Sequence, residues 1–123
     1  MAPFLFEEIT RKIIGSAFEV YKELGYGFLE KVYENALLIE LRLKNLKAEN
    51  QKPIRIFYKS EPVGDYIADI LVENKIIVEL KAEKEYNPKH QAQLINYLKA
   101  TELKVGLLIN FGEKECKPKR IVN

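Results

Sequence analysis

Three charged residues inside two otherwise apolar segments constrain the fold of this chain more than any other feature. The segments cover residues 66–72 and 76–82, and they contain Asp69, Glu79 and Lys81. A charge within a packed core is costly unless it is paired or binds a metal, so the fold must bring these groups together. Because alternate residues of a strand share a face, Glu79 and Lys81 project from the same side.

The register of the hairpin between these segments decides whether Asp69 lies beside Glu79. A three-residue loop over 73–75 places the two residues opposite each other, whereas a two-residue turn sends the Asp69 carboxylate to the other face. We predict the longer loop, because a type I′ turn would force Glu73 to a positive φ. Two carboxylates and one ammonium group would then form a site for a hard divalent cation and an activated water.

Length and composition indicate one soluble globular domain over residues 1–123. The chain is 47% hydrophobic and 31% charged, which excludes a disordered or membrane class. No apolar run reaches the roughly 18 residues of a membrane helix, and the acidic start is not a signal peptide. Cys116 is the only cysteine, which excludes an internal disulfide and fits a reducing, cytoplasmic location. The net charge of +2 neither requires nor excludes nucleic acid.

Hydrophobic periodicity predicts the element order α-α-β-β-β-α-β. Helices are expected over about 4–24 and about 29–44, and from Pro88 to about Thr101 with Asn87 as the N-cap. The predicted core of the second helix consists of Val32, Ala36, Leu37, Ile39 and Leu43.

Strands are expected over 47–59, around Asp69, over 76–80 and over 104–111, with a turn spanning residues 60–64. Residues 76–80 are apolar on both faces, so this strand is expected at the centre of the sheet. The end of the chain reads as a basic turn followed by a short apolar stretch, or as one last strand. The predicted fold is an α/β sandwich of helices around a mixed sheet.

Three motifs appear in one order along the chain, and together they resemble a known superfamily. Asp69 followed by Glu79-x-Lys81 resembles the PD-(D/E)XK nucleases, residues 27–33 read as G-x-x-E-x-x-Y, and residues 93–97 read as Q-L-x-x-Y. The combination is similar to the small GxxExxY family over nearly the whole chain. Tyr21 stands where that family usually has a histidine, and Ile67 where an arginine commonly precedes the aspartate.

The resemblance implies a restriction-endonuclease-like α-β-β-β-α-β core, with a mixed central sheet flanked by helices and an extra N-terminal helix. It also implies roles for individual residues in phosphodiester hydrolysis. Asp69, Glu79 and the backbone carbonyl of Leu80 would hold Mg²⁺ or Mn²⁺, with waters completing the shell. Lys81 would hold the attacking water and stabilise developing charge.

The other two motifs supply further candidate catalytic residues. Glu30 would add a carboxylate from the second helix, either to a second ion or to a metal-bound water. Gln93 and Tyr97 are one helical turn apart on one face, and would position a phosphate, a water or Lys81.

Simpler structural roles remain open for each candidate. Glu79 and Lys81 would then pair on a solvated face, and Glu30 would be a charge at a helix N-terminus. Tyr97 would pack between helix and sheet, and Gln93 would be a surface amide. The remaining expectations are that Tyr33 belongs to the core and that His90 is exposed, with a peripheral phosphate contact as the alternative. The basic residues near the end are expected to be solvated, with contact to a nucleic-acid backbone as the alternative.

The leading hypothesis is therefore a metal-dependent nuclease or nuclease-like phosphodiesterase acting on DNA or RNA. The alternative is a non-catalytic nucleic-acid- or protein-binding module that retains the nuclease fold. A purely structural oligomerisation domain would not need the buried charges. Nucleic acid is the expected partner, a homodimer is possible, and no membrane partner is expected.

Overall fold

The computed structural model describes residues 6–123, so the predicted start of the first helix near Phe4 lies outside the described residues. The helices are α1 (Glu7–Leu24), α2 (Glu30–Leu43) and α3 (Pro88–Thr101). The strands are β1 (Ala48–Tyr58), β2 (Glu61–Val72), β3 (Ile76–Lys81), β4 (Val105–Phe111) and β5 (Cys116–Val122). Within the described part, no helix is long and apolar enough to cross a membrane.

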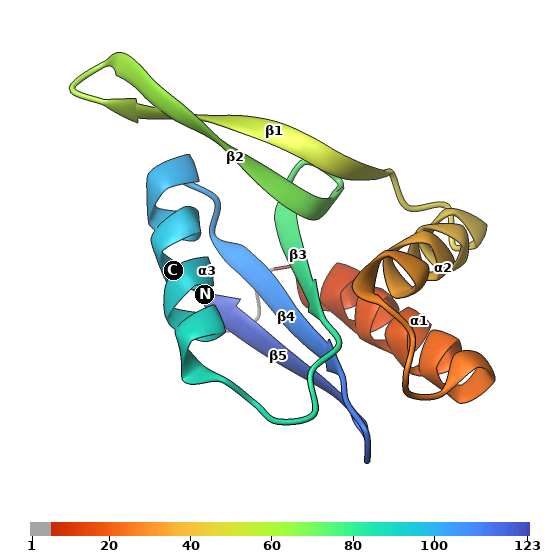
Figure 1. Cartoon of the computed structure of the whole chain (residues 1–123). Helices are drawn as coiled ribbons and strands as arrows, with labels where there is room; N and C mark the ends of the chain where they lie inside the picture. Colours follow the sequence, from red (N-terminus) through yellow and green to blue (C-terminus); the bar gives the residue numbers. More distant parts are fainter. Residues whose placement is uncertain (1–5) are drawn as a thin grey trace.

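The five strands form one mixed sheet in the order β1-β2-β3-β4-β5. Only β3 and β4 run parallel, and α3 forms the crossover that a parallel pair requires. Figure 1 shows α1 and α2 on one face of the sheet and α3 on the other. This arrangement confirms the predicted α/β fold with a mixed central sheet, flanking helices and an additional N-terminal helix.

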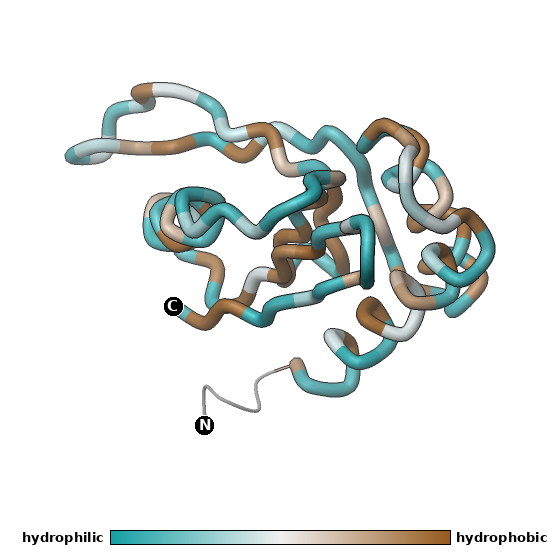
Figure 2. Tube along the Cα trace, turned by 60° about the horizontal axis from the view of Figure 1, so that its bottom comes forward, coloured by the Kyte–Doolittle hydropathy of each residue, from teal (hydrophilic) through white to brown (hydrophobic). Residues whose placement is uncertain are grey.

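Each face of the sheet has its own hydrophobic cluster. The cluster under α1 and α2 includes Ile13, Leu37, Ile70 and Leu107, all fully buried. The cluster under α3 includes Leu94, Leu98 and Ile77 among others. The brown segments in Figure 2 lie mainly in the interior between sheet and helices. Strand β3 is therefore covered on both faces, as its apolar sequence predicts.

Strand β2 leaves the central sheet partway along its length. It pairs with β3 only over Ile70–Val72, and from there to its N-terminal end it pairs with β1 alone. Strands β1 and β2 form a long hairpin that extends beyond the rest of the sheet (Figure 1). In this hairpin, Ile54 and Ile56 pack against the cluster under α3.

The alternation of side chains between the two faces of the sheet is interrupted in β2, at the point where β2 and β3 separate. The β1–β2 pairing is interrupted at Gln51 and Asp69, and Gln51 has a φ of 52°. Ala68 and Leu71 both belong to the cluster under α3, although they are three residues apart. Strict alternation would place them on opposite faces, so the interruption shifts which side chains face α3.

The predicted hairpin register is confirmed, but the reason given for it was wrong. Val72 pairs with Ile76, which leaves a three-residue loop over 73–75. Glu73 nevertheless has a φ of 55°. Its side chain accepts a hydrogen bond from the Lys47 backbone amide at 2.6 Å, and its own amide donates to the Lys47 carbonyl at 2.8 Å. These contacts offset the cost of a left-handed conformation at a non-glycine residue.

Three sequence predictions need correction. The buried face of α2 is turned relative to the prediction, since Ile39 and Leu43 are exposed. The turn after β1 is tighter than predicted, because β2 begins at Glu61 and the turn lies at Lys59 and Ser60. The end of the chain is the last strand that the sequence left as an alternative, β5, paired antiparallel with β4, so the basic-turn interpretation is wrong. The buried residues of α2 are Tyr33, Glu34, Leu37, Leu38 and Leu41.

Tyr33 fixes the connection between α1 and α2. Its ring is fully buried and stacks on Phe111 with a centroid separation of 4.3 Å. Its hydroxyl donates a hydrogen bond to the Gly25 carbonyl and accepts one from the Phe28 amide. Gly27 in the same loop has a φ of 116°, which favours glycine. The first and last residues of the G-x-x-E-x-x-Y motif thus have structural roles, which confirms Tyr33 as a core residue.

We expect Tyr33→Phe to lower the unfolding free energy by about 1–3 kcal/mol, because the Gly25 carbonyl loses its donor while the stacked ring remains. Tyr33→Ala should cost about 3–5 kcal/mol, since it also leaves a cavity. Urea unfolding of both variants and the wild type measures the two losses. Equal unfolding midpoints for Tyr33→Phe and the wild type would show that the hydroxyl does not secure the loop.

Candidate active site

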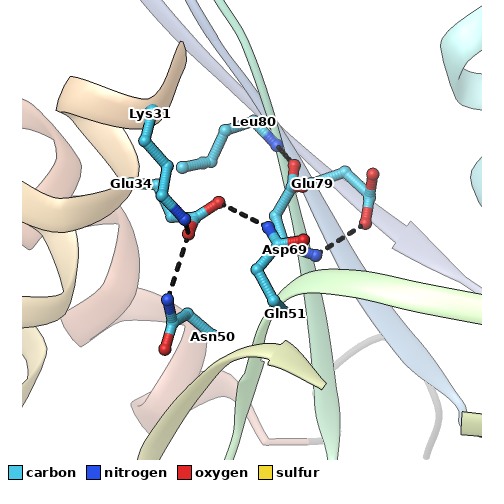
Figure 3. A network of polar contacts seen from close by, with 7 residues as sticks. All are labelled: Lys31, Glu34, Asn50, Gln51, Asp69, Glu79 and Leu80. Carbon is cyan, nitrogen blue, oxygen red and sulfur yellow. Dashed lines mark hydrogen bonds and ion pairs between the residues drawn. The ribbon is translucent and has the colours of Figure 1, made fainter. Parts of the chain in front are cut away.

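Asp69 and Glu79 meet where β2 separates from β3. The Asp69 Oδ2 accepts a hydrogen bond from the Leu80 amide at 2.8 Å, and the Glu79 Oε1 accepts one from the Asp69 amide at 3.2 Å (Figure 3). Each carboxylate therefore binds a backbone amide of the opposite strand at the point where the backbone ladder stops. The predicted proximity of Asp69 and Glu79 is confirmed, and their role as metal ligands stays a prediction.

A buried carboxylate that was not predicted from the sequence lies beside this pair. Glu34 of α2 is only 4% exposed, and it binds Lys31 at 2.7 Å. It also accepts hydrogen bonds from Asn50 at 3.3 Å and from Gln51 at 2.8 Å. Figure 3 shows this group next to Asp69, at the start of the β1–β2 hairpin. The network thus ties α2 to the interrupted part of β1.

The sequence did contain a signal for Glu34. A helical face drawn through Tyr33, Leu37 and Leu41 includes position 34, since residues three and four apart share a face. The expected face used Val32 and Ile39, and this choice left Glu34 among the solvated positions. A correct helical phase would have predicted a carboxylate on the buried face of α2.

Tyr66 connects the candidate residues of α3 to Glu79. Its hydroxyl donates a hydrogen bond to the Glu79 Oε1, and its ring stacks on Tyr97 with a centroid separation of 3.7 Å. The exposed Gln93 donates to the Tyr97 hydroxyl at 3.3 Å. Gln93 and Tyr97 therefore share a face, as predicted, and reach Glu79 through Tyr66. Tyr66 was not predicted as a site residue, because strict alternation along β2 would have separated it from Asp69.

Burial raises the pKa of both central carboxyl groups. Desolvation and the charge of Asp69 raise the pKa of Glu79 to about 7, against the hydrogen bond that Tyr66 donates. Desolvation also raises the pKa of Asp69, and the nearby charge of Glu34 adds to the effect. Desolvation and the charge of Glu79 raise the pKa of Tyr66, which keeps its phenolic proton available for donation.

Lys81 and Glu30 lie within electrostatic range of this pair. Glu30 is the first residue of α2 and is exposed. Partial desolvation raises its pKa, while the charge of Lys81 lowers it and that of Asp69 raises it. Among residues 6–123, no carboxylate lies within 4.0 Å of the Lys81 ammonium. Its amine is therefore available to another ligand.

A second polar group lies beside Lys81, and it includes the histidine that was predicted from the sequence to be exposed. The His90 side chain is only 18% exposed, and its Nε2 lies 2.9 Å from both carboxylate oxygens of Glu83. Asn110 of β4 holds the Glu83 backbone through two hydrogen bonds, at 2.9 and 3.0 Å. The charge of His90 also lowers the pKa of Glu30, so the two groups belong to one region.

The donor set suits a hard divalent cation that keeps several waters. In the described chain, no three His, Cys, Asp or Glu side chains are grouped closely enough to hold an ion. The candidate side-chain ligands are Asp69 and Glu79, two oxygen donors whose pKa values are raised by burial. Mg²⁺ is commonly bound by one or two carboxylates with water in its remaining positions. The part of the Leu80 carbonyl stays a prediction.

Two positions differ from the GxxExxY pattern, and neither makes a hydrogen bond or ion pair with Asp69 or Glu79 in the described residues. The Tyr21 hydroxyl donates to the carbonyls of Gly112 and Glu113, and its ring contacts Phe111 at 6.4 Å between centroids. Ile67 is exposed on the β1–β2 hairpin. Tyr21 therefore links α1 to the end of β4, and neither residue replaces a proposed metal ligand.

Comparison with known proteins identifies the class to which this fold and site belong. The sequence profile of the PD-(D/E)XK nuclease superfamily matches residues 7–121. The chain belongs to this superfamily. No curated protein matches the sequence.

A solved structure supports the fold independently. The crystal structure of SSO0001 is similar with a TM-score of 0.58 and 20% sequence identity, covering 76% of this chain and 50% of that one. At this identity the likeness concerns the fold alone. The present chain spans half the length of that protein.

The raised pKa of Glu79 predicts a pH dependence of stability in the absence of metal. A carboxyl group whose pKa is raised by folding stabilises the native state below its unfolded pKa, and this contribution is lost as the pH rises through the folded pKa. The window therefore runs from about 4.5 to about 7. The loss across this window is on the order of 3 kcal/mol, because a tenfold change in proton affinity corresponds to about 1.4 kcal/mol.

Urea unfolding in EDTA at several pH values, with wild type and Glu79→Gln side by side, measures this effect. The glutamine keeps an acceptor for Tyr66 and for the Asp69 amide but cannot ionise. We expect Glu79→Gln to gain stability relative to the wild type as the pH rises through the window. A constant difference between the two proteins would mean that Glu79 is not destabilised by its surroundings.

Proposed function

We propose that this protein is a metal-dependent phosphodiesterase that hydrolyses nucleic acid, as a nuclease or a nuclease-like enzyme. The observation that carries the proposal is the meeting of Asp69 and Glu79 at the fork between β2 and β3, with Lys81 two residues further on the same strand. Membership of the PD-(D/E)XK superfamily supports the reaction class. The narrower assignment to the GxxExxY family rests on the motifs alone.

Asp69 and Glu79, with the Leu80 carbonyl, would hold the cation, and Mg²⁺ or Mn²⁺ suits their oxygen donors. Such a cation supplies Lewis-acid polarisation of a phosphoryl oxygen and lowers the pKa of a bound water. The Tyr66 hydroxyl holds the Glu79 carboxylate in place. Because the Asp69 carboxylate is anchored on the Leu80 amide, both ligands are positioned before any cation arrives.

Lys81 would hold the attacking water and stabilise the charge that develops on the phosphate. Glu30, at the start of α2, lies within electrostatic range of Lys81. There it would accept a proton from the attacking water or bind a second cation. Gln93 would contact the phosphate directly, since it is exposed and its amide already bonds to Tyr97. Tyr97 would act indirectly, because its ring stacks on Tyr66 and thereby positions the Tyr66 hydroxyl at Glu79.

One observation favours a second candidate, a nucleic-acid- or protein-binding module that keeps the nuclease fold. Asp69 and Glu79 each accept a backbone amide, so they help to hold the fork together without any metal. A module without catalytic activity would retain both residues for that reason. It would have no comparable need for Lys81, and this difference separates the two functions.

Lys81→Ala should reduce cleavage at least about 100-fold if Lys81 holds the water or stabilises transition-state charge. Its effect on nucleic-acid affinity should be small, because one lost cation changes the salt slope by only about one unit. Cleavage of labelled DNA and RNA, single- and double-stranded, in Mg²⁺ or Mn²⁺ provides the measurement. Lys12→Ala, which removes an exposed lysine of α1, serves as the matched control.

Cleavage that survives both Lys81→Ala and Glu79→Gln would come from a contaminant or from another site. A wild-type protein that binds nucleic acid and cleaves none of the four substrates would be a binding module. Either result would overturn the proposed mechanism.

Divalent metal should raise the melting temperature, because an ion that binds only the native state stabilises it by mass action. The gain should be about 3 kcal/mol when the metal concentration is about 100 times the dissociation constant. Asp69→Asn and Glu79→Gln should each remove the gain while leaving the metal-free protein at least as stable. Thermal unfolding with EDTA, Mg²⁺ or Mn²⁺ tests this, with Asp65→Asn on the exposed hairpin as the control.

A further inference from the structure

A cavity of about 360 Å³ begins at Lys81 and extends away from the paired carboxylates. Neither Asp69 nor Glu79 lines it, so it is a separate space that shares one residue with the candidate active site. Its walls come from the connection between β3 and α3, from the first turn of α3, and from β4 and β5. The volume lies in the range of small-ligand pockets, about 300–1,000 Å³.

The strand register places this cavity in line with the active site. Lys81 pairs with Asn110 of β4, which pairs in turn with Lys117 of β5. In the neighbouring row, Glu79 pairs with Leu108, and Leu108 pairs with Lys119. Each row crosses two strand spacings, roughly 10 Å. A substrate strand that lies along these rows passes from the proposed reacting phosphate into the cavity.

The charge of the cavity suits an anion. Three lysines line it, namely Lys81, Lys117 and Lys119. Of the two lining glutamates, Glu83 is already paired with His90. The lysines of β5 were expected to be solvated, but Lys117 and Lys119 both line the cavity. Lys117 forms an exposed ion pair with Glu115 at 3.6 Å, so Lys81 and Lys119 are the main candidates to contact an anion. Ile121, two residues beyond Lys119, packs in the cluster under α3, so this side of β5 faces that helix.

The cavity also offers surfaces for a flat, apolar group. Leu108 and Pro118 line it, and Tyr86 forms part of its wall. Tyr86 is 43% exposed, its hydroxyl donates a hydrogen bond to Gln91, and the Lys119 ammonium lies 5.3 Å from the ring centroid. A partly exposed ring held at its hydroxyl edge can stack on a nucleobase, while the lysine contacts the phosphate.

We infer that this cavity binds one nucleotide of the substrate strand, next to the reacting phosphate, with its base unpaired. The inference rests on the proposed function and narrows its substrate. A base that enters this cavity and stacks on the Tyr86 ring leaves its paired position, so the nucleotide must come from a single strand, a frayed end or a flipped position. The protein therefore prefers single-stranded nucleic acid to a blunt duplex.

Fluorescence anisotropy with a labelled oligothymidylate and a blunt duplex of equal length tests this, in EDTA so that no cleavage interferes. The wild type should bind the single strand more tightly than the duplex. Tyr86→Ala should weaken single-strand binding by about 5- to 150-fold, the range found when one stacked base loses its aromatic partner. Tyr86→Phe should bind like the wild type, because it keeps the ring.

The hairpin tip supplies a matched control. Tyr58 is exposed, and the Lys59 ammonium lies 5.4 Å from its ring centroid, which reproduces the Tyr86 arrangement outside the cavity. Tyr58→Ala should leave affinity unchanged. Lys119→Met should lower the salt slope for the single strand by about 0.7, and Lys59→Met should not.

The results distinguish this inference from the proposed function. If the wild type cleaves nucleic acid but Tyr86→Ala binds as well as Tyr58→Ala does, the cavity does not hold a base and the inference alone is wrong. A preference for the duplex would overturn it in the same way. If binding depends on Tyr86 but no substrate is cleaved in Mg²⁺ or Mn²⁺, the inference holds and the proposed chemistry fails. If no nucleic acid is bound or cleaved, both fail.

Discussion

The separation of β2 from β3 at Asp69 is the constraint on which the rest of this structure depends. A sheet that opens in its interior leaves backbone amides without ladder partners, and a buried amide must find another acceptor. The Asp69 carboxylate accepts from the Leu80 amide of β3, and the Glu79 carboxylate accepts from the Asp69 amide of β2. Lys81 lies within electrostatic range of both carboxylates, and its charge lowers their pKa values. Structure and proposed chemistry therefore use the same two carboxylates.

Holding several carboxylates at this fork is electrostatically unfavourable, and the surrounding residues limit the cost. Glu34 is compensated by Lys31 and two amide side chains, while Tyr66 donates to Glu79. The raised pKa values of Asp69 and Glu79 show that this compensation is incomplete. A bound cation would complete it. Glu34, whose two oxygens are bonded to Lys31, Asn50 and Gln51, is therefore a structural carboxylate. Asp69 and Glu79 remain the candidate metal ligands.

The sheet extends the site in two directions from the fork. Across the strands, β4 and β5 carry the rows that lead from Lys81 and Glu79 to the lysines of the cavity. Above the sheet, α3 contributes Tyr97 to hold Tyr66, and its first turn contributes His90 to hold Glu83. The QLxxY motif meets the central motif through the stack of Tyr97 on Tyr66, and Tyr33 of the GxxExxY motif stacks on Phe111 of β4.

Local periodicity in the sequence was enough to predict the element order as far as β4 and the α/β class. The register of the β2–β3 hairpin, and with it the proximity of Asp69 and Glu79, was predicted correctly, although Glu73 adopts the positive φ that the argument for the longer loop had excluded. The sequence did not determine the phase of α2, and so missed Glu34, nor that β5 is a strand. Tyr66 was missed because the interruption at Gln51 changes the alternation that sequence reading assumes. The pairing of Glu83 with His90 and the cavity beside Lys81 appear only in the tertiary structure. The pairing depends on how the connection between β3 and α3 folds back, and the cavity joins that connection to β4 and β5, and no local sequence pattern encodes either arrangement.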